Sequence, residues 1–174
     1  MTGPPPRRAA FAALVAAAAA GWAFWLIAAP ILGATAASPR PAVWAAAVTY
    51  RAGAVICHQQ DARSLHVGGV RMPVCARCFG LYAGAAAGAL VAAAWVFAAR
   101  RPMQLRLGRW RLAALACGLP TLAAWAGEHL GGLAVGGHAR AVLAVPFGAA
   151  VAAIVALWAG GAAFEDSAPK SKLH

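Results

Sequence analysis

The stretch FGLYAGAAAGALVAAAWVFAA, residues 79–99, contains no charged side chain. About 20 consecutive apolar residues are enough for a helix to cross the hydrocarbon core of a bilayer. The stretch therefore predicts a membrane-spanning helix. Its glycines Gly80, Gly84 and Gly88 are four residues apart and so share one helix face. Small residues on one face allow another helix backbone to approach closely in lipid, and we expect these glycines to be packing positions.

The rest of the chain has the same character. Hydrophobic residues make up 63% of the 174 residues and charged residues only 11%, whereas about a quarter of a soluble domain is charged. Three more apolar runs, residues 9–32, 112–133 and 141–164, are each long enough to span a bilayer. The length suits one small bundle. We expect a single transmembrane domain over residues 1–164.

The run Pro41–Ile56 differs from these four, because it is shorter and Arg51 interrupts it. We interpret it as an interfacial or half-inserted helix. The predicted fold is an all-α integral membrane bundle of about four transmembrane helices with this additional helix. Residues 165–174 are polar and have little to bury, so we expect a disordered tail.

Basic residues predict the orientation of the bundle, because Lys and Arg are enriched in cytoplasmic connections. With four spans, one side carries nine basic residues, namely Arg7, Arg8, Arg100, Arg101, Arg106, Arg109, Arg111, Lys170 and Lys172. The other side carries six, namely Arg40, Arg51, Arg63, Arg71, Arg77 and Arg140. We expect both termini in the cytoplasm and residues 57–78 facing outward from a bacterial inner membrane. The net charge of +11 then reflects topology, and we expect no nucleic-acid partner.

The N-terminal run has one alternative interpretation. Ala34, Thr35 and Ala36 form an A-x-A cleavage pattern after a basic start, as in a secretory signal peptide. The apolar run is longer than the usual 7–15 residues of a signal-peptide core. We therefore favour a retained first span over cleavage after Ala36.

The window CHQQDARSLHVGGVRMPVCARC, Cys57–Cys78, holds three of the four cysteines. Cys75 and Cys78 form a C-x-x-C pair, and Cys57 and His58 lie upstream of a glycine-containing stretch that can fold back. Together they make the Cys₃His set of a tetrahedral zinc site. We predict zinc or another soft transition metal on these four residues, with His66 as an alternative imidazole ligand. The fourth cysteine, Cys117, is expected to be a small buried apolar residue.

Two other functions remain open. In an oxidising compartment the CARC motif could act as a thiol-disulfide redox or electron-transfer pair, since nearby arginines lower thiol pKa values. Alternatively, the chain is a non-catalytic membrane scaffold with a structural disulfide. The sequence indicates no reaction or substrate, so whether the protein is an enzyme stays open. The expected partner is the lipid bilayer, with a homo-oligomer or another membrane protein as a further alternative.

Polar residues elsewhere are expected to support the site. Glu128 and Arg140 lie near the facing ends of the last two spans, where an ion pair would offset the cost of charges near membrane depth. His129 or His138 could reach a metal held by the thiols. Around the window itself, the expected supporting residues are Gln59, Arg63, Ser64, Arg77 and Tyr82.

The motifs CHQ, RS and PVCARCFGLYAG resemble DUF2085, a prokaryotic integral-membrane family of unknown function. The matching positions are Cys57, His58, Gln59, Arg63, Ser64, Pro73, Cys75, Arg77, Cys78, Gly80, Tyr82 and Gly84. Asp61 and Ala62 stand where the family pattern has Pro-Glu, and Glu128 stands where an aspartate is usual. The resemblance implies that the window is one functional unit and favours His58 over His66. It implies no reaction.

Overall fold

A computed structural model describes residues 6–35, 38–99 and 104–165. Within these residues the chain is mainly helical, as predicted. The five helices are α1 (Pro6–Ala34), α2 (Arg40–Ile56), α3 (Ala76–Ala98), α4 (Leu107–Leu130) and α5 (Gly137–Ala159). The four short strands are β1 (Ser64–Val67), β2 (Val70–Cys75), β3 (Gln104–Arg106) and β4 (Ala163–Glu165). The predicted disordered tail beyond Glu165 and the cleavage position Ala36 lie outside the described residues.

Three of the helices, α1, α3 and α5, are long and apolar enough to cross a membrane. They correspond to the spans expected at 9–32, 79–99 and 141–164, although α5 begins earlier, at Gly137. Helix α4 is not among them. Its mean hydropathy is lower because Arg109 and Arg111 occupy one end and Glu128 and His129 the other. Hydropathy in the described residues thus identifies three spans and does not confirm the expected fourth.

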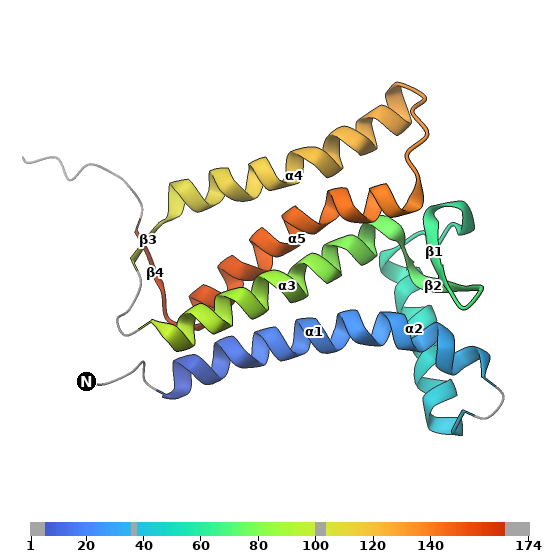
Figure 1. Cartoon of the computed structure of the whole chain (residues 1–174), viewed down its shortest axis with the longest axis horizontal. Helices are drawn as coiled ribbons and strands as arrows, with labels where there is room; N and C mark the ends of the chain where they lie inside the picture. The colour runs from blue at the N-terminus through green and yellow to red at the C-terminus, as the bar shows by residue number, and fades with distance from the viewer. Residues whose placement is uncertain (1–5, 36–37, 100–103, 166–174) are drawn as a thin grey trace, which may run out of the picture.

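The long helices run side by side, and α2 turns across one end of the bundle (Figure 1). The β1–β2 hairpin and the α4–α5 connection lie at that same end, whereas the start of α1 and the strands β3 and β4 lie at the other. β3 and β4 pair in parallel, which joins the segment before α4 to the segment after α5. The bundle therefore has one elaborated end, formed by α2 and the hairpin.

The closest packing in the bundle is between α3 and α5. A methyl group added to Gly80, Gly84 or Gly88 would lie 2.0 to 2.1 Å from a backbone carbonyl oxygen of α5. On α5, Gly148 approaches the carbonyl of Leu81 equally closely. Real carbon and oxygen atoms do not approach to such distances, so only glycine fits at these points. The glycine stripe thus sets the distance between the two helices.

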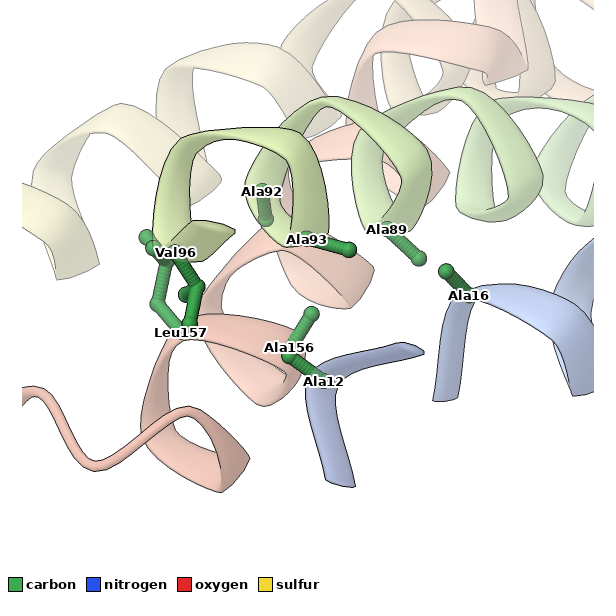
Figure 2. Packing of buried hydrophobic residues seen from close by; sticks show 8 residues of the cluster. All are labelled: Ala12, Ala16, Ala89, Ala92, Ala93, Val96, Ala156 and Leu157. Atoms are coloured by element: carbon green, nitrogen blue, oxygen red, sulfur yellow. The ribbon is translucent and has the colours of Figure 1, made fainter. Parts of the chain in front are cut away.

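Small side chains also fill the core where α1 meets this pair. Figure 2 shows the buried cluster, whose members are Ala12, Ala16, Ala89, Ala92, Ala93, Val96, Ala156 and Leu157. Alanine dominates because helices in lipid gain stability from close van der Waals contact rather than from the burial of large apolar surfaces. The result is a tightly packed three-helix core toward the end of the bundle opposite α2 and the hairpin.

The segment expected to be a folded-back loop contains an antiparallel hairpin. Val67 pairs with Val70, and the two residues between them, Gly68 and Gly69, have φ values of 58° and 79°. Two-residue hairpin turns of this kind require positive φ, which glycine adopts without strain. The Gly-Gly dipeptide therefore explains the reversal that the sequence predicted. The hairpin also opposes Ser64 to Cys75 at its base.

Candidate metal centre

Three thiols converge at the elaborated end of the bundle. The sulfur atoms of Cys57, Cys75 and Cys78 all lie within 4.8 Å of one another. Each comes from a different position in the fold: Cys57 follows the last residue of α2, Cys75 ends β2, and Cys78 lies in the first turn of α3. Segments that are distant in sequence thus deliver three soft ligand atoms to one point.

A direct contact joins the two ends of the window. The backbone N–H of Cys57 donates to Gly53 at 2.8 Å and so continues the hydrogen bonding of α2. The Cys57 sulfur in turn accepts a hydrogen bond from the backbone N–H of Cys75 at 3.2 Å. This bond satisfies a donor at the start of α3, where helical N–H groups lack intrahelical partners. The thiol positions therefore depend on how α2 is held against β2.

Gln59 holds α2 and β2 together. Its side-chain Nε2 donates to the carbonyls of Tyr50 at 2.8 Å and Pro73 at 2.7 Å. The backbone of Gln59 has φ 46°, which is uncommon for a residue other than glycine. A methyl group at Gly53 would lie 2.3 Å from the Pro73 oxygen, so α2 also contacts β2 closely. Sequence reasoning placed Gln59 near the site, and the structure gives it this bridging role.

The surroundings of the thiols are apolar. Cys57 and Cys75 are 7% and 5% exposed, and they share a buried cluster with Leu26, Met72 and Val74. Trp22 and Tyr82 pack against this cluster, and their ring centroids lie 6.0 Å apart in an edge-on arrangement. Tyr82 was expected near the site, whereas the α1 residues Trp22 and Leu26 were not. No short motif links them to the cysteines, so only packing reveals them.

The chemistry of Cys75 is altered by its neighbours. Hydrogen bonding with the Cys78 thiol lowers the pKa of Cys75 to about 5, although burial acts in the opposite direction. Cys75 also immediately precedes α3, whose N-terminus carries partial positive charge and favours anions. Thiolate is the form that binds metals and attacks disulfides. Cys75 is therefore the thiol prepared for either chemistry at neutral pH, whereas the same hydrogen bond, together with burial, raises the pKa of Cys78.

The spacing of the sulfur atoms fits a thiophilic metal. Zinc binds thiolates at roughly 2.3 Å in tetrahedral geometry, so two sulfur ligands are about 3.8 Å apart. The three thiols already lie within 4.8 Å of one another. The donor set and its geometry therefore fit the metal that the sequence predicted.

The fourth predicted ligand does not join this group. Among the described residues, His58 is not one of the mutually close ligand atoms, and its Nδ1 accepts a hydrogen bond from the N–H of Gln60 at 3.3 Å. The backbone of Cys57 is extended, with φ −145° and ψ 136°. Side chains that follow one another along extended backbone point to opposite faces. Cys57 is accordingly buried while His58 is exposed.

The other candidate imidazoles also have different surroundings. His66 contacts the carboxylate of Asp61 at 3.1 Å on the exposed side of the hairpin. His129 hydrogen-bonds to the carbonyl of Trp125 and stacks on its indole ring. His138, at the start of α5, is exposed. In the part of the chain that the structure describes, the converging group therefore contains sulfur alone.

A charge cluster joins α3, α4 and α5 at the same end. Arg77 donates to Glu128 at 3.0 Å, and Arg140 donates to the other oxygen of the same carboxylate. Glu128 is only 3% exposed. Arg140 also reaches the carbonyl of Ala62 at 3.4 Å, which ties α5 to the segment before the hairpin. The expected Glu128–Arg140 pair is present, and Arg77 is a second partner that the sequence did not indicate.

Arg77 lies between Cys75 and Cys78 in the sequence, in the first turn of α3. Its Nε is buried, and among the described residues it has no hydrogen-bond partner. A buried N–H without a partner is costly. Of the remaining expected supports, Ser64 donates to the carbonyl of Gln60 at 2.8 Å. Arg63 lies in the short helical turn Asp61–Arg63.

Comparison with known proteins matches a region that begins with the same window. The family model described as "Predicted membrane protein (DUF2085)" matches residues 57–154. This range contains the three cysteines, the charge cluster and the glycine stripe. "Uncharacterized protein MJ1492" of Methanocaldococcus jannaschii is 45% identical over 42 residues, which is 24% of this chain and 27% of that protein. The match thus spans little more than a quarter of that relative. No solved structure matches the chain.

Proposed function

The chain belongs to the DUF2085 family of predicted membrane proteins, and we propose that it binds a transition metal, zinc in the first place, at the membrane surface. The observation that carries this proposal is the convergence of Cys57, Cys75 and Cys78 within 4.8 Å. Thiolate-rich sites select soft or borderline ions such as zinc and copper(I). The resident metal would be held by these three sulfur atoms.

The fourth coordination position is exchangeable in this proposal. Extended backbone at Cys57 directs His58 away from the sulfur atoms, so we do not assign His58 as a required ligand. Zinc sites with three protein ligands keep the fourth position for water or a substrate, whereas closed sites are structural. An open position at the end of the bundle that also carries the Arg77–Glu128–Arg140 cluster would suit chemistry or transfer of the metal. That cluster carries a net charge of +1, which balances the −1 charge of zinc bound by three thiolates.

The surrounding topology follows from the register of α3 and α5. Gly80 faces Ala141, Gly84 faces Val145, and Gly88 faces Ala149, so residue numbers rise together along the two helices. Helices α3 and α5 are therefore parallel. If both cross the bilayer in the same direction, the chain must cross back between them, and α4 is the segment available (Figure 1).

This reasoning supports a single domain with four spans despite the lower hydropathy of α4. It also supports α2 as the interfacial helix, because Trp44 and Val55 are 72% and 86% exposed at the end of the bundle. Both termini would face the cytoplasm of a bacterial inner membrane. The metal centre would then face outward beneath α2 and the hairpin, with lipid as the surrounding partner.

Elemental analysis of the purified protein tests the metal proposal. Protein prepared under reducing conditions and dialysed against trace zinc should hold one ion per chain. Cys75→Ser should lose it, because two thiolates cannot replace three. Cys117→Ser is the matched control, since this cysteine lies in α4 outside the cluster, and it should retain the metal. Metal retained in Cys75→Ser, or lost equally in Cys117→Ser, would contradict the proposal.

In the same experiment, His58→Ala distinguishes a ligand set of three cysteines from a set that also includes His58. We expect it to keep one ion per chain, because the imidazole is exposed and outside the sulfur cluster. Complete loss of metal would show that His58 rotates in as the fourth ligand. Arg77→Gln should retain the metal but bind it about 10- to 100-fold more weakly, as is typical when a group supporting a ligand is removed.

A thiol-disulfide function is the second candidate, and the low pKa of Cys75 favours it. In that case Cys75 and Cys78 form a disulfide as two electrons and two protons pass to a partner disulfide, which becomes two thiols. Thiol counting against a series of glutathione buffers distinguishes the two functions. Metal-free protein that cycles reversibly between one and three free thiols in the cluster would favour redox chemistry. A permanently oxidised pair would indicate a structural disulfide in a scaffold.

A further inference from the structure

A cavity of about 530 Å³ lies beside the hairpin, between the end of α1, helix α2 and the start of β2. None of the three clustered cysteines lines it. Its walls are mostly apolar and come from Pro30, Gly33, Val43, Ala46, Ala47 and Ala54, among others. Its volume is within the 300–1,000 Å³ typical of small-ligand sites. The cavity is thus a separate feature of the elaborated end.

Two of the polar side chains that line the cavity keep free hydrogen-bond donors, and both are arginines. Tyr50 donates its hydroxyl to the carbonyl of Arg71, and Gln59 uses its Nε2 for the two carbonyls described above. The guanidinium groups of Arg51 and Arg71 remain. Arg71 uses one N–H for the carbonyl of Gln59, and a guanidinium has five N–H donors. Within the described residues Arg51 forms no ion pair.

The chain contains only four acidic residues, and within the described residues none lines the cavity. Asp61 contacts His66, and Glu128 is occupied by Arg77 and Arg140. Glu165 lies in β4 at the opposite end of the bundle (Figure 1). In the part of the chain that the structure describes, no carboxylate thus balances Arg51 and Arg71, and a bound anion would supply the counter-charge.

We propose that this cavity binds a single-chain anionic amphiphile of the fatty-acid class, taken from the surrounding membrane. The apolar walls would hold the acyl chain, and Arg51 and Arg71 would hold the carboxylate, for which the planar guanidinium is the best-matched partner. Helix α2 exposes Trp44, Val48 and Val55. These residues suit the membrane interface and would place the cavity where such a molecule partitions. The inference is independent of metal binding.

Fluorescence titration with dansyl-undecanoic acid in an uncharged detergent tests the proposal on the full chain. We expect saturable binding of one probe per chain that oleate displaces. Oleyl alcohol, which has the same chain without the charge, and inorganic phosphate, which has charge without the chain, should both fail to displace it. Displacement by the alcohol would overturn the role of the arginines. Displacement by phosphate alone would show a simple anion site.

Two pairs of variants locate the binding site. Ala47→Trp fills the cavity and should abolish binding, whereas Ala52→Trp, on an exposed part of α2 that does not line the cavity, should leave binding unchanged. Arg51→Gln should weaken binding about tenfold or more, which corresponds to roughly 1.4 kcal/mol. Arg40→Gln on the same helix should have no effect.

Helix content by circular dichroism and the thermal unfolding midpoint of each variant serve as folding controls. Arg51 is exposed, so its substitution tests the site even if the tryptophan variant fails to fold. Equal behaviour of Ala47→Trp and Ala52→Trp, or unchanged binding in Arg51→Gln, would overturn the proposal.

Discussion

Cys75 shows how neighbours determine the chemistry of a single residue. It ends β2 and immediately precedes α3, and its backbone N–H is taken by the sulfur of Cys57. Its own sulfur interacts with the thiol of Cys78, which lowers its pKa to about 5 from an ordinary 9.0. The same residue therefore contacts both other thiols. Experiments on Cys75 can therefore distinguish metal binding from redox chemistry.

The pH dependence of Cys75 alkylation follows from this shift. Because the pKa is lowered, the thiolate predominates above about pH 5. In metal-free, reduced protein the rate of reaction with iodoacetamide should rise through that pH and be nearly constant from pH 7 to pH 9. Peptide mapping by mass spectrometry measures the rate at each pH. Cys78→Ser removes the main cause of the shift, so its midpoint should move upward; a wild-type rate still rising above pH 8 would contradict the assignment.

The adjacent residues Cys57 and His58 show that a sequence motif does not specify the direction in which each of its side chains points. Both are potential ligands, and the sequence analysis assigned both to one set of metal ligands. The backbone conformation separates them, because extended φ and ψ values at Cys57 place consecutive side chains on opposite faces. The grouping of the three cysteines could be predicted from spacing. The exclusion of the imidazole depends on two torsion angles that no local pattern specifies.

At the scale of the elements, the parallel pair α3 and α5 fixes the site. The glycine stripe brings the two backbones into contact directly below Cys75 and Cys78. Arg77 in α3 and Arg140 in α5 then reach the same carboxylate, Glu128 of α4. Replacing a glycine in the stripe should therefore disturb both stability and metal binding, because the first turn of α3 would move relative to α5.

Gly84→Leu tests this dependence. A side chain there would overlap the carbonyl of Val145, where a methyl group alone would lie at 2.1 Å. Overpacking of this kind costs typically 1–3 kcal/mol and occasionally more, so we expect a loss of about 3 kcal/mol in unfolding by sodium dodecyl sulfate titration. Ala87→Leu, on the exposed face of the same helix, should change stability by less than about 0.5 kcal/mol. Equal effects of the two substitutions would refute the packing.

For the whole molecule, the two ends of the bundle differ in structure. One end carries α2, the hairpin, the thiols and the cavity. The other carries the start of α1 and the β3–β4 pairing (Figure 1). The parallel arrangement of α3 and α5 requires the intervening chain to return along the length of the bundle. The direction of α4 along the bundle therefore follows from the whole fold and not from the hydropathy of α4.

Reporter fusions test the topology in cells. With four spans, green fluorescent protein fused to the C-terminus should fluoresce, and alkaline phosphatase fused after residue 134 should be active, since that connection would face outward. The reciprocal fusions should be inactive. If α4 does not cross, an odd number of spans places the C-terminus outside. A fluorescent C-terminal fusion together with an inactive phosphatase at residue 134 would also exclude the proposed orientation.

The sequence by itself predicted that the chain lies in a membrane and that α1, α3 and α5 are apolar enough to span it. It also predicted that the three cysteines form one group. These features follow from local composition and spacing, since an uncharged run of sufficient length has few alternatives to crossing a membrane. The glycine stripe likewise indicates close packing whatever its partner. Gly68 and Gly69 indicate a reversal because few other residues adopt positive φ.

Tertiary structure alone decided which residues meet. The contact of Arg77 with Glu128 joins positions that are 51 residues apart, and Gln59 bridges two elements through carbonyls of Tyr50 and Pro73. The cavity with Arg51 and Arg71 likewise depends on how α1, α2 and β2 come together. Such contacts arise from the relative placement of whole elements, which is set by the summed packing of the bundle. No short stretch of sequence contains that information.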